Sequence, residues 1–181
     1  MTTPADEESQ FSLTDFVIRP ITKADLRALE WDGVYTNYRR MYADLYRNAR
    51  SGRALMWMIE SPLGVMIGQV FVMLHSVENK IADGKNRAYI FAFRIKPAWR
   101  NLGIGRHLMQ FVEDDLYQRG FRIVTLNVAK ENIRAQRLYH RLGYKIFGSS
   151  PGVWSYKDHK GEIHHVNEPA WRMSKTLSSR N

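Results

Sequence analysis

The sequence predicts one mixed α/β domain, of the α+β kind, in which helices cover both faces of a mixed sheet. A chain of 181 residues, 44% of them hydrophobic, is long enough to bury one substantial core. Apolar runs with strand character alternate with runs of helical period. A strand, a glycine turn, a helix and a strand follow one another from Arg87 to Ala129, and such a βαβ unit joins two parallel strands by a right-handed crossover.

The N-terminal half combines a polar tail, a helical region and hairpin-like strands. We expect residues 1–14 to be a flexible tail and residues 15–181 to form the single domain. The Asp32-Gly33 pair is expected to break the helical region into two short helices. The expected elements are a strand over 16–21, helices over about 25–50, strands over 54–60 and 64–74 joined at Ser61-Pro62-Leu63-Gly64, and a strand over about 87–95.

The C-terminal half begins with a helix of clear apolar period. Leu108, Phe111, Val112 and Leu116 repeat at helical spacing, and Gly120 lies where a C-terminal helix glycine is expected. The remaining expected elements are a buried strand over 122–129, a helix that Gly143 ends, strands around 144–147 and 171–177, and between these strands a polar loop that contains Gly152, Asp158 and Gly161.

The glycine turn of this βαβ unit, Arg100-Asn101-Leu102-Gly103-Ile104-Gly105, is the most informative segment of the chain. Two glycines spaced by one residue let the backbone approach a ligand closely, so that amides at a helix N-terminus can bind an anion. A plain strand-to-helix turn fits the same spacing. The segment therefore indicates a phosphate site without requiring one.

Composition narrows the function classes. The chain has no cysteine, which excludes disulfides, thiol nucleophiles and thiolate metal sites. Its start is polar and acidic, and its longest apolar run is too short to span a bilayer, so we expect a cytoplasmic protein without a membrane partner. A formal charge of +9 favours anionic ligands, and basic residues recur in two clusters: Arg39, Arg40, Arg47, Arg50 and Arg53, then Lys130, Arg134, Arg137 and Arg141. Solvated helix faces would also give these clusters.

Two segments in order, RIKPAWRNLGIGRHLM and LNVAKENIRAQRLYHRLGYKIFG, resemble the acyl-CoA-binding core of the GNAT N-acetyltransferase superfamily. Arg100, Gly103 and Gly105 match the family's phosphate loop, and the second motif matches at Asn132, Ala135, Tyr139, Gly143 and Tyr144. The resemblance implies a GNAT-like sheet of about six to seven strands with a splayed parallel pair. It also implies transfer of an acetyl group from acetyl-CoA to a primary amine of a protein, peptide or small molecule, without a metal.

The resemblance also implies roles for particular residues. Tyr139 would protonate the departing CoA thiolate, and a phenol with a pKa near 10 carries the proton needed for this at neutral pH. A core aromatic and, for Asn132, a helix cap fit the same positions. The implied cofactor-binding residues are Phe93, Arg94 and Ile95 through backbone groups of a bulged strand, then Arg100, Asn101, Leu102, Gly103, Ile104, Gly105, Arg106, Asn132, Ala135 and Tyr139.

The acceptor side is less defined. Trp31 and Tyr35 are the candidates to line an acceptor cleft, whereas the i+4 spacing of Tyr38, Tyr42 and Tyr46 favours a core or interface stripe. The strand over 87–95 lacks the carboxylate that many relatives place there, so the general base stays unassigned. The candidates by residue type are Glu30, Asp32, Glu60, His75 and Glu78.

Three alternatives remain open. His159, His164 and His165 suggest a metal site, but no acidic or cysteine partner has a diagnostic spacing, so we expect solvated loop residues. The same fold also serves for a non-catalytic acyl-CoA-binding or sensing module. The basic charge fits a nucleic-acid-binding domain, although no known nucleic-acid motif is present. The aromatic content is compatible with a homodimer.

Overall fold

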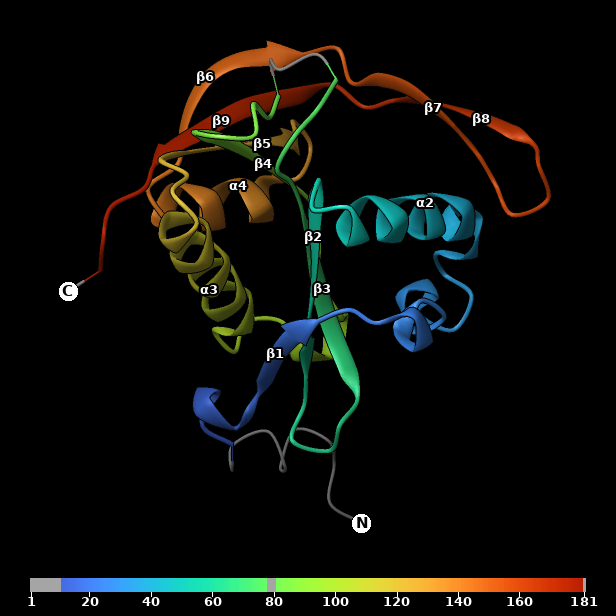
Figure 1. The fold of residues 1–181 in the computed structure, drawn as a ribbon, viewed down its shortest axis with the longest axis horizontal. Coiled ribbons are helices and arrows are strands. Elements are labelled where there is room, and N and C mark those ends of the chain that lie inside the picture. The colour runs from blue at the N-terminus through green and yellow to red at the C-terminus, as the bar shows by residue number, and fades with distance from the viewer. Residues whose placement is uncertain (1–10, 78–80, 181) are drawn as a thin grey trace.

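The computed structural model describes residues 11–77 and 81–180. Its centre is a seven-stranded sheet in the order β1-β2-β3-β4-β5-β9-β6 (Figure 1). All neighbouring strands of this sheet are antiparallel except β4 and β5, which are parallel as the βαβ unit predicts. The strands are β1 (Val17–Pro20), β2 (Ala54–Glu60), β3 (Met66–Met73), β4 (Arg87–Ile95), β5 (Ile123–Ala129), β6 (Lys145–Ser150) and β9 (Ala170–Thr176).

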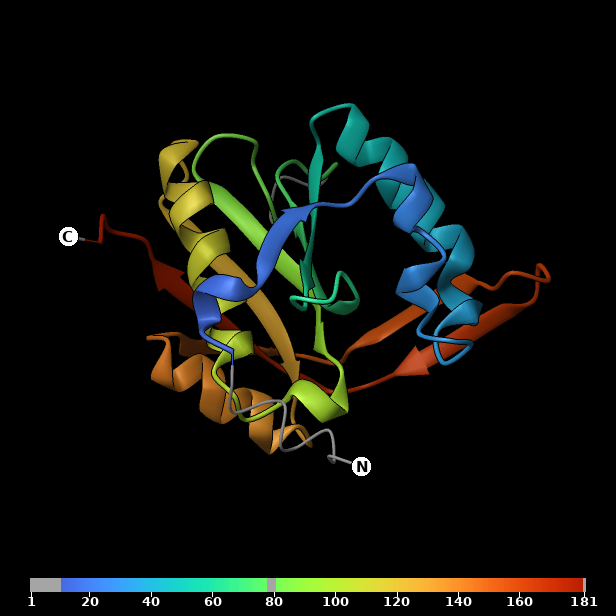
Figure 2. The ribbon, with the colours of Figure 1, turned by 90° about the horizontal axis from the view of Figure 1, so that it is seen from below.

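Helices cover both faces of the sheet. Viewed from below, α3 (Ile104–Gln118) and α4 (Ile133–Arg141) lie on one side and α2 (Arg39–Arg50) on the other (Figure 2). Each face has its own apolar core, one containing Leu108 and Val112 of α3 and the other containing Tyr42 and Leu45 of α2. The predicted mixed α/β fold is therefore confirmed.

The helix α3 follows directly from its sequence. Leu108, Val112 and Leu116 recur every four residues and are fully buried, which places one stripe of the helix against the sheet. Gly103 at its N-cap and Gly120 after its end both have positive φ angles, +81° and +98°. Glycine adopts this conformation without a steric penalty, so the two glycines set the limits of the helix.

The parallel strands β4 and β5 separate halfway along their length. Their pairing runs from Arg87↔Ile123 to Ile90↔Leu126 and stops there, although β4 continues to Ile95. The same strand shifts register against β3 between Gln69 and Phe71, and Ala92 has a φ of +50°. One extra residue bends a strand and increases its twist, so this bulge accounts for the splay that the family resemblance implied.

The segment between β6 and β9 differs from the prediction. Residues expected to form a polar loop instead form an antiparallel hairpin of β7 (Val153–Lys157) and β8 (Ile163–Asn167), which extends beyond the main sheet over α2 (Figure 1). Its polar composition hid its strands. Aromatic and β-branched residues on both sides of the Asp158–Gly161 turn, Trp154 and Tyr156 before it and Ile163 and Val166 after it, are a hairpin signal that could have found it.

The first helical region also differs in detail. In place of two helices it has the 3₁₀ turns Lys23–Asp25, Ala28–Glu30 and Thr36–Tyr38, followed by the single helix α2. The predicted break is present, because Trp31, Asp32 and Gly33 all have positive φ angles. Three consecutive residues in that region cannot continue a right-handed helix.

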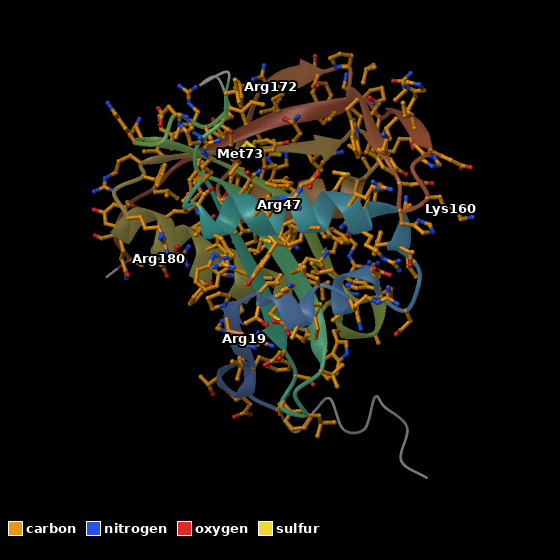
Figure 3. All side chains as sticks on the ribbon, turned by 45° about the vertical axis from the view of Figure 1, so that its right-hand side comes forward. Arg19, Arg47, Met73, Lys160, Arg172 and Arg180 are labelled. Carbon is orange, nitrogen blue, oxygen red and sulfur yellow. The ribbon has the colours of Figure 1, made fainter. Side chains whose placement is uncertain are left out.

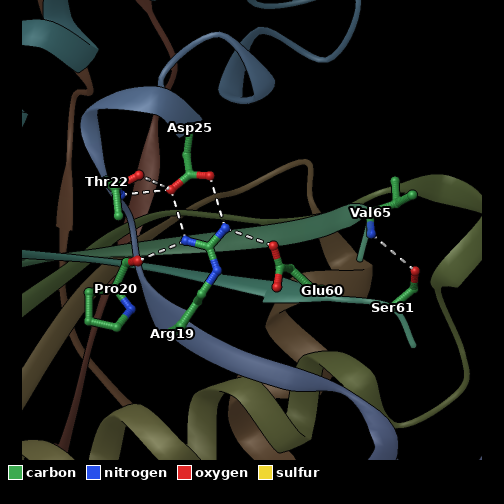
Figure 4. A network of polar contacts seen from close by, with 7 residues as sticks. All are labelled: Arg19, Pro20, Thr22, Asp25, Glu60, Ser61 and Val65. Atoms are coloured by element: carbon green, nitrogen blue, oxygen red, sulfur yellow. Dashed lines mark hydrogen bonds and ion pairs between the residues drawn. The ribbon is translucent and has the colours of Figure 1, made fainter. Parts of the chain in front are cut away.

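The edge strand β1 is held by an ion-pair network (Figure 4). Arg19 donates from Nη1 to Asp25 Oδ2 at 2.8 Å and from Nη2 to Glu60 Oε1 at 2.7 Å. Asp25 also accepts from the backbone amide and the hydroxyl of Thr22. The network ties β1 to β2 and to the 3₁₀ turn Lys23–Asp25.

The beginning and the end of the described chain are anchored. Leu13–Asp15 form a 3₁₀ turn capped by Ser12, whereas most of the predicted tail, residues 1–10, lies outside the described residues. The buried Glu113 of α3 accepts from Lys175 at 2.6 Å and from Arg180, which is labelled in Figure 3, at 2.5 Å. Within residues 11–77 and 81–180, no helix combines the length and apolarity needed to cross a membrane.

Candidate active site

The glycine turn forms a set of free amide donors at the start of α3. Among the described residues, no carbonyl or side chain accepts from the backbone amides of residues 101–106, and no side chain caps the helix. Positive φ angles at Asn101 (+64°) and Gly103 (+81°) turn the chain into the helix. Unpaired amides at a helix N-terminus attract anions, so this turn has the chemistry of a phosphate site.

Gly105 brings the helix close to the bulged strand. A Cβ atom at this position would lie 3.1 Å from Phe93 Cζ and 3.6 Å from Ile95 Cγ1. Such a contact is tighter than nine in ten real Cβ contacts, so a side chain here would require Phe93 to shift by a few tenths of an ångström. The turn, the helix and the splayed end of β4 are thus fixed relative to one another.

Phe93 also connects the strand to Tyr139. The two ring centroids lie 6.3 Å apart, and Tyr139 packs edge-on against Tyr144 at 5.8 Å. Tyr139 is 6% exposed, and burial raises the pKa of its phenol above the ordinary value, with the neighbouring Tyr89 adding to the effect. The phenol therefore keeps its proton across the neutral and alkaline range.

Other predicted cofactor-side residues have defined partners. Asn132 caps α4, with its Oδ1 accepting from the amide of Ala135 at 3.1 Å. Arg100 donates from Nε to the carbonyl of Ile95 at 2.8 Å, so part of its guanidinium positions the turn. Arg134 donates to Asn101 Oδ1 at 3.0 Å, which places the second basic cluster beside the glycine turn. Leu102 and Arg106 are exposed, whereas Ile104 is buried in the core.

Trp31 and Tyr35 lie together on the opposite face of the sheet. Their rings meet edge-on at 5.1 Å, and Trp31 donates from Nε1 to Gln69 Oε1 at 3.0 Å. Trp31 is 7% exposed and Tyr35 is half-buried. Tyr35 is thus the more accessible of the two predicted acceptor-side residues.

The tyrosine stripe of α2 belongs partly to the core. Tyr42 is buried in the α2 core cluster, and Tyr38 and Tyr46 pack against that cluster. Burial, outweighing the effect of Arg94, raises the pKa of Tyr42 to about 12. The structural interpretation of the stripe is therefore confirmed for Tyr42.

Sequence reasoning missed the aromatic residues that β7 of the hairpin adds next to the tyrosines of the α2 face. Tyr38 lies 4.8 Å from Tyr156 and 6.4 Å from Trp154 between ring centroids, and Asn37 donates to the Tyr156 hydroxyl at 2.6 Å. The guanidinium of Arg94 lies 4.2 Å from the Tyr35 ring centroid and 5.7 Å from that of Tyr38. We call Tyr35, Tyr38, Tyr42, Trp154 and Tyr156 the aromatic cluster.

The carboxylates considered as bases are mostly engaged. Glu30 is buried and accepts from Arg39 at 2.6 Å and from Thr36 at 3.0 Å, and chiefly the Arg39 bond lowers its pKa. Glu60 is paired with Arg19. Asp32 is exposed. His75 forms an isolated antiparallel β-bridge with Asp83 through the backbone, and Glu78 lies outside the described residues.

The histidines of the hairpin are not all solvated loop residues. His164 lies on β8 and contacts Asp158 Oδ2 through Nε2 at 2.8 Å, and chiefly this bond lowers the pKa of Asp158 to about 2. Single ligand atoms of Asp158, Glu162 and His164 lie within 4.8 Å of one another. The amides of Lys160 and Glu162 already bind Asp158 Oδ1, so the carboxylate closes the hairpin turn.

The face of β4, β5, β9 and β6 beside the hairpin is left open. It forms a shallow cavity of about 510 Å³, whose lining includes Tyr89, Asn127, Phe147 and Arg172. Tyr89 stacks on Phe91 at 5.8 Å, which joins the cavity to the core below α2. The sheet face opposite α3 is therefore open to a ligand.

Residues 23–144 match the model of the acetyltransferase (GNAT) family, which is more than half of the chain. Solved structures of similar fold include the ribosomal-protein-S18-alanine N-acetyltransferase of Escherichia coli, with a TM-score of 0.64 and 20% identity. The alignment covers 92% of this chain and 96% of that one.

Two further structures are similar over the same extent. Ard1 of Thermoplasma volcanium has a TM-score of 0.69 and 18% identity, over 91% of this chain and 99% of that one. Spermidine N-acetyltransferase of Vibrio cholerae, solved with CoA and spermine, has a TM-score of 0.66 and 18% identity. The alignment covers 91% of this chain and 96% of that one. At these identities the structural likeness supports the fold.

Proposed function

The chain belongs to the GNAT acetyltransferase family, and from this premise we propose that it transfers acetyl from acetyl-CoA directly to a primary amine. The observation that carries the proposal is the row of unpaired amides at the start of α3, next to the splayed end of β4. These amides and the splay support a competent cofactor site in this chain.

The residues of the turn and of β4 fit the proposed cosubstrate. The amides of 101–106 and the α3 dipole would bind the pyrophosphate, with the exposed Arg106 adding positive charge. The part of β4 from Phe93 to Ile95 has no partner on β5, so backbone groups on that side are available to the pantetheine arm, apart from the Ile95 carbonyl that accepts from Arg100. When bound, acetyl-CoA supplies the activated acetyl group.

We assign the proton donor to Tyr139. In direct transfer the amine nitrogen forms a bond to the acetyl carbon while the carbon–sulfur bond breaks. Tyr139 would give its phenolic proton to the departing sulfur, and the proton that the amine loses would pass to water. Arginines hold the carboxylates of Glu30 and Glu60, so neither of these two is poised to take that proton.

Calorimetric titration with acetyl-CoA, with NAD and GTP as controls, tests the cofactor site. One-to-one binding specific for acetyl-CoA supports the proposal, and equal binding of all three ligands would contradict it. Turnover with a panel of amines then separates an enzyme from a non-catalytic acyl-CoA-binding module on the same fold.

A further inference from the structure

Arg94 is a cation on the acceptor side whose charge no acidic side chain balances. Its guanidinium lies over Tyr35 and donates to the Tyr42 hydroxyl at 3.4 Å. Within the part of the chain that the structure describes, Arg94 makes no ion pair with a carboxylate. Aromatic rings hold the guanidinium in place while most of its donors stay available.

Gln69 adds a second unsatisfied donor at the same place. It is fully buried directly across from Arg94 in the β3–β4 register, so both side chains lie on the same face of the sheet. Its Oε1 accepts from Trp31, but its Nε2 has no partner among the described residues. A buried amide without a partner is costly, so a ligand group that reached Gln69 would gain a hydrogen bond that no described residue supplies.

The position relative to the proposed reaction also fits. Arg94 lies two residues beyond the Ala92 bulge, on the part of β4 that has separated from β5. Phe93 and Ile95, its neighbours, belong to the core on the α3 face, so Arg94 points to the opposite face. A group bound by Arg94 would therefore sit on the acceptor face of the strand whose backbone we assign to the pantetheine arm.

The charges around this point are unsuited to a polycation. Arg39 and Arg19 neutralise Glu30 and Glu60, while Lys96 lies 5.9 Å from the Trp31 ring centroid. Glu168 is close enough to Tyr38 to add to the burial that raises the pKa of that phenol, but it is exposed and not paired with Arg94. The groups described around Arg94 that keep a free donor or a positive charge are thus Gln69 and Lys96, and the unpaired carboxylate described there is that of Glu168.

We propose that Arg94, supported by the aromatic cluster and Gln69, binds a carboxylate of the acceptor, so that the enzyme prefers an amine with a nearby acidic group to a polyamine. The inference rests on the proposed acetyl transfer. The acceptor's carboxylate belongs either to an acidic residue near a peptide N-terminus or to a free amino acid. Bidentate recognition of a carboxylate is the contact for which a planar guanidinium is best suited.

The test compares three peptides that begin Ala-Glu, Ala-Gln and Ala-Lys and are otherwise identical, together with free glutamate and spermidine. For each we would measure kcat/KM and, in the presence of CoA, the dissociation constant. We expect the Ala-Glu peptide to exceed the Ala-Lys peptide about tenfold in kcat/KM, a typical effect of one charge-assisted hydrogen bond. Glutamate tests the free-amino-acid source, and spermidine should be the poorest acceptor.

The variant Arg94→Gln should bring the ratio of the two peptides close to one. The affinity for acetyl-CoA should stay unchanged, because Arg94 is assigned to the cofactor only through its backbone. Arg47→Gln is the matched control, because Arg47 is an exposed arginine of α2 that is paired with Asp44 (Figure 3). It removes the same charge and should keep the preference. Arg94→Lys keeps the charge without the planar pair of donors, so it should keep only part of the preference for the acidic peptide.

The outcomes separate this inference from the proposed function. If acidic peptides bind preferentially but nothing is acetylated, carboxylate recognition stands and acetyl transfer fails. If the wild-type chain binds all three peptides equally or prefers the lysine peptide, and free glutamate binds no better than spermidine, the inference is wrong, whatever the turnover. A preference for the acidic peptide that survives in Arg94→Gln also overturns the inference, and the role of Arg94 is then its cation–π contact with Tyr35.

Discussion

Tyr139 is the residue at which the proposed chemistry can be tested most directly. The variant Tyr139→Phe keeps the ring that contacts Phe93 and Tyr144 and removes only the hydroxyl. We expect kcat to fall about 100-fold, the lower range for loss of a general acid, while the dissociation constant for acetyl-CoA changes little. Steady-state kinetics and calorimetry on the same preparations measure both. An unchanged kcat at neutral pH would remove Tyr139 from this role.

The raised pKa of Tyr139 also predicts the alkaline part of the pH profile. Burial is the main cause of this shift, and it opposes formation of the charged phenolate. Because the protonated form is the donor, kcat should not decline on account of Tyr139 up to about pH 10, the ordinary pKa of a tyrosine. A decline with an apparent pKa near 8 that disappears in Tyr139→Phe would show that the phenol ionises early.

Asp25 offers a prediction on stability at the same scale. Chiefly its bond to Arg19 lowers its pKa (Figure 4). A carboxylate whose pKa is lower in the folded than in the unfolded state stabilises the fold above its unfolded pKa of about 3.9, and this contribution is lost as the pH falls towards the folded value. Asp25→Asn should therefore lower the free energy of unfolding by about 1–3 kcal/mol at pH 7.

The difference between Asp25→Asn and the wild-type chain should persist to about pH 4 and shrink below it. Urea titrations at pH 7, 4 and 2.5 would follow it. The exposed Asp44, paired with Arg47 on α2, supplies the matched variant Asp44→Asn, which should change stability little at any pH. A difference that grows on acidification would contradict the sign of the linkage.

At the scale of elements, the glycine turn before α3 is the most sensitive part of the proposed cofactor site. Gly103→Val places a β-branched residue at a φ of +81°, which strains the turn and displaces its amides. We expect at least a tenfold weaker binding of acetyl-CoA, corresponding to the loss of one or two charge-assisted hydrogen bonds.

Gly120 provides the control for this variant. It has a φ of +98° at the other end of the same helix, and no atom lies within 4 Å of the place that a Cβ would take. Gly120→Val should therefore lower the free energy of unfolding about as much as Gly103→Val does, and it should leave the affinity for acetyl-CoA unchanged. Equal losses of affinity in both variants would indicate general destabilisation of α3 and argue against a specific role for the turn.

The hairpin of β7 and β8 is an element with a separable role. The strands β6 and β9 pair directly up to Ser150↔Ala170, so the main sheet does not depend on residues 153–167. Replacing these residues by a short Gly-Ser link removes Trp154 and Tyr156 from the aromatic cluster. We expect unchanged binding of acetyl-CoA and a KM for the preferred acceptor that rises about tenfold, as for loss of a contact worth about 1.4 kcal/mol.

The elements that could be predicted from the sequence are those whose apolar period or glycine pattern is strong. The helix α3, the parallel pair and the glycine turn follow from Leu108, Val112, Leu116 and the two glycines. The hairpin escaped because its strands are polar, and its contact with the acceptor-side region, Trp154 on Tyr38, joins residues more than a hundred positions apart. The position of Arg94 beneath Tyr35 likewise depends on tertiary packing, which no local pattern encodes.

For the whole molecule, the splay of β4 and β5 divides the sheet into two parts. The strands β1 to β4 and the strands β5, β9 and β6 are joined in the sheet by four residue pairs, Arg87↔Ile123 to Ile90↔Leu126. A ligand lying in the splay contacts both parts and binds only the folded state. Acetyl-CoA at 100 times its dissociation constant should therefore stabilise the fold by about 2.7 kcal/mol.

This stabilisation would be read as a rise in Tm with acetyl-CoA concentration. Gly103→Val should show a smaller rise than the wild-type chain, because its affinity is lower. Amide hydrogen exchange would locate the effect, with added protection expected on β4 beyond Ala92 and on the last residues of β5. Protection confined to α2 would place the ligand on the wrong face of the sheet.

The edges of the sheet bear on how two copies of the chain can associate. The strand β1 has four residues and ends at Pro20, which has no amide to donate, and β6 shifts register between Ile146 and Gly148. Neither edge offers a long, flat row of free backbone groups to a second molecule. A homodimer of this protein should therefore form through side chains on its helices or its open sheet face, and a sheet continued across two subunits is not expected.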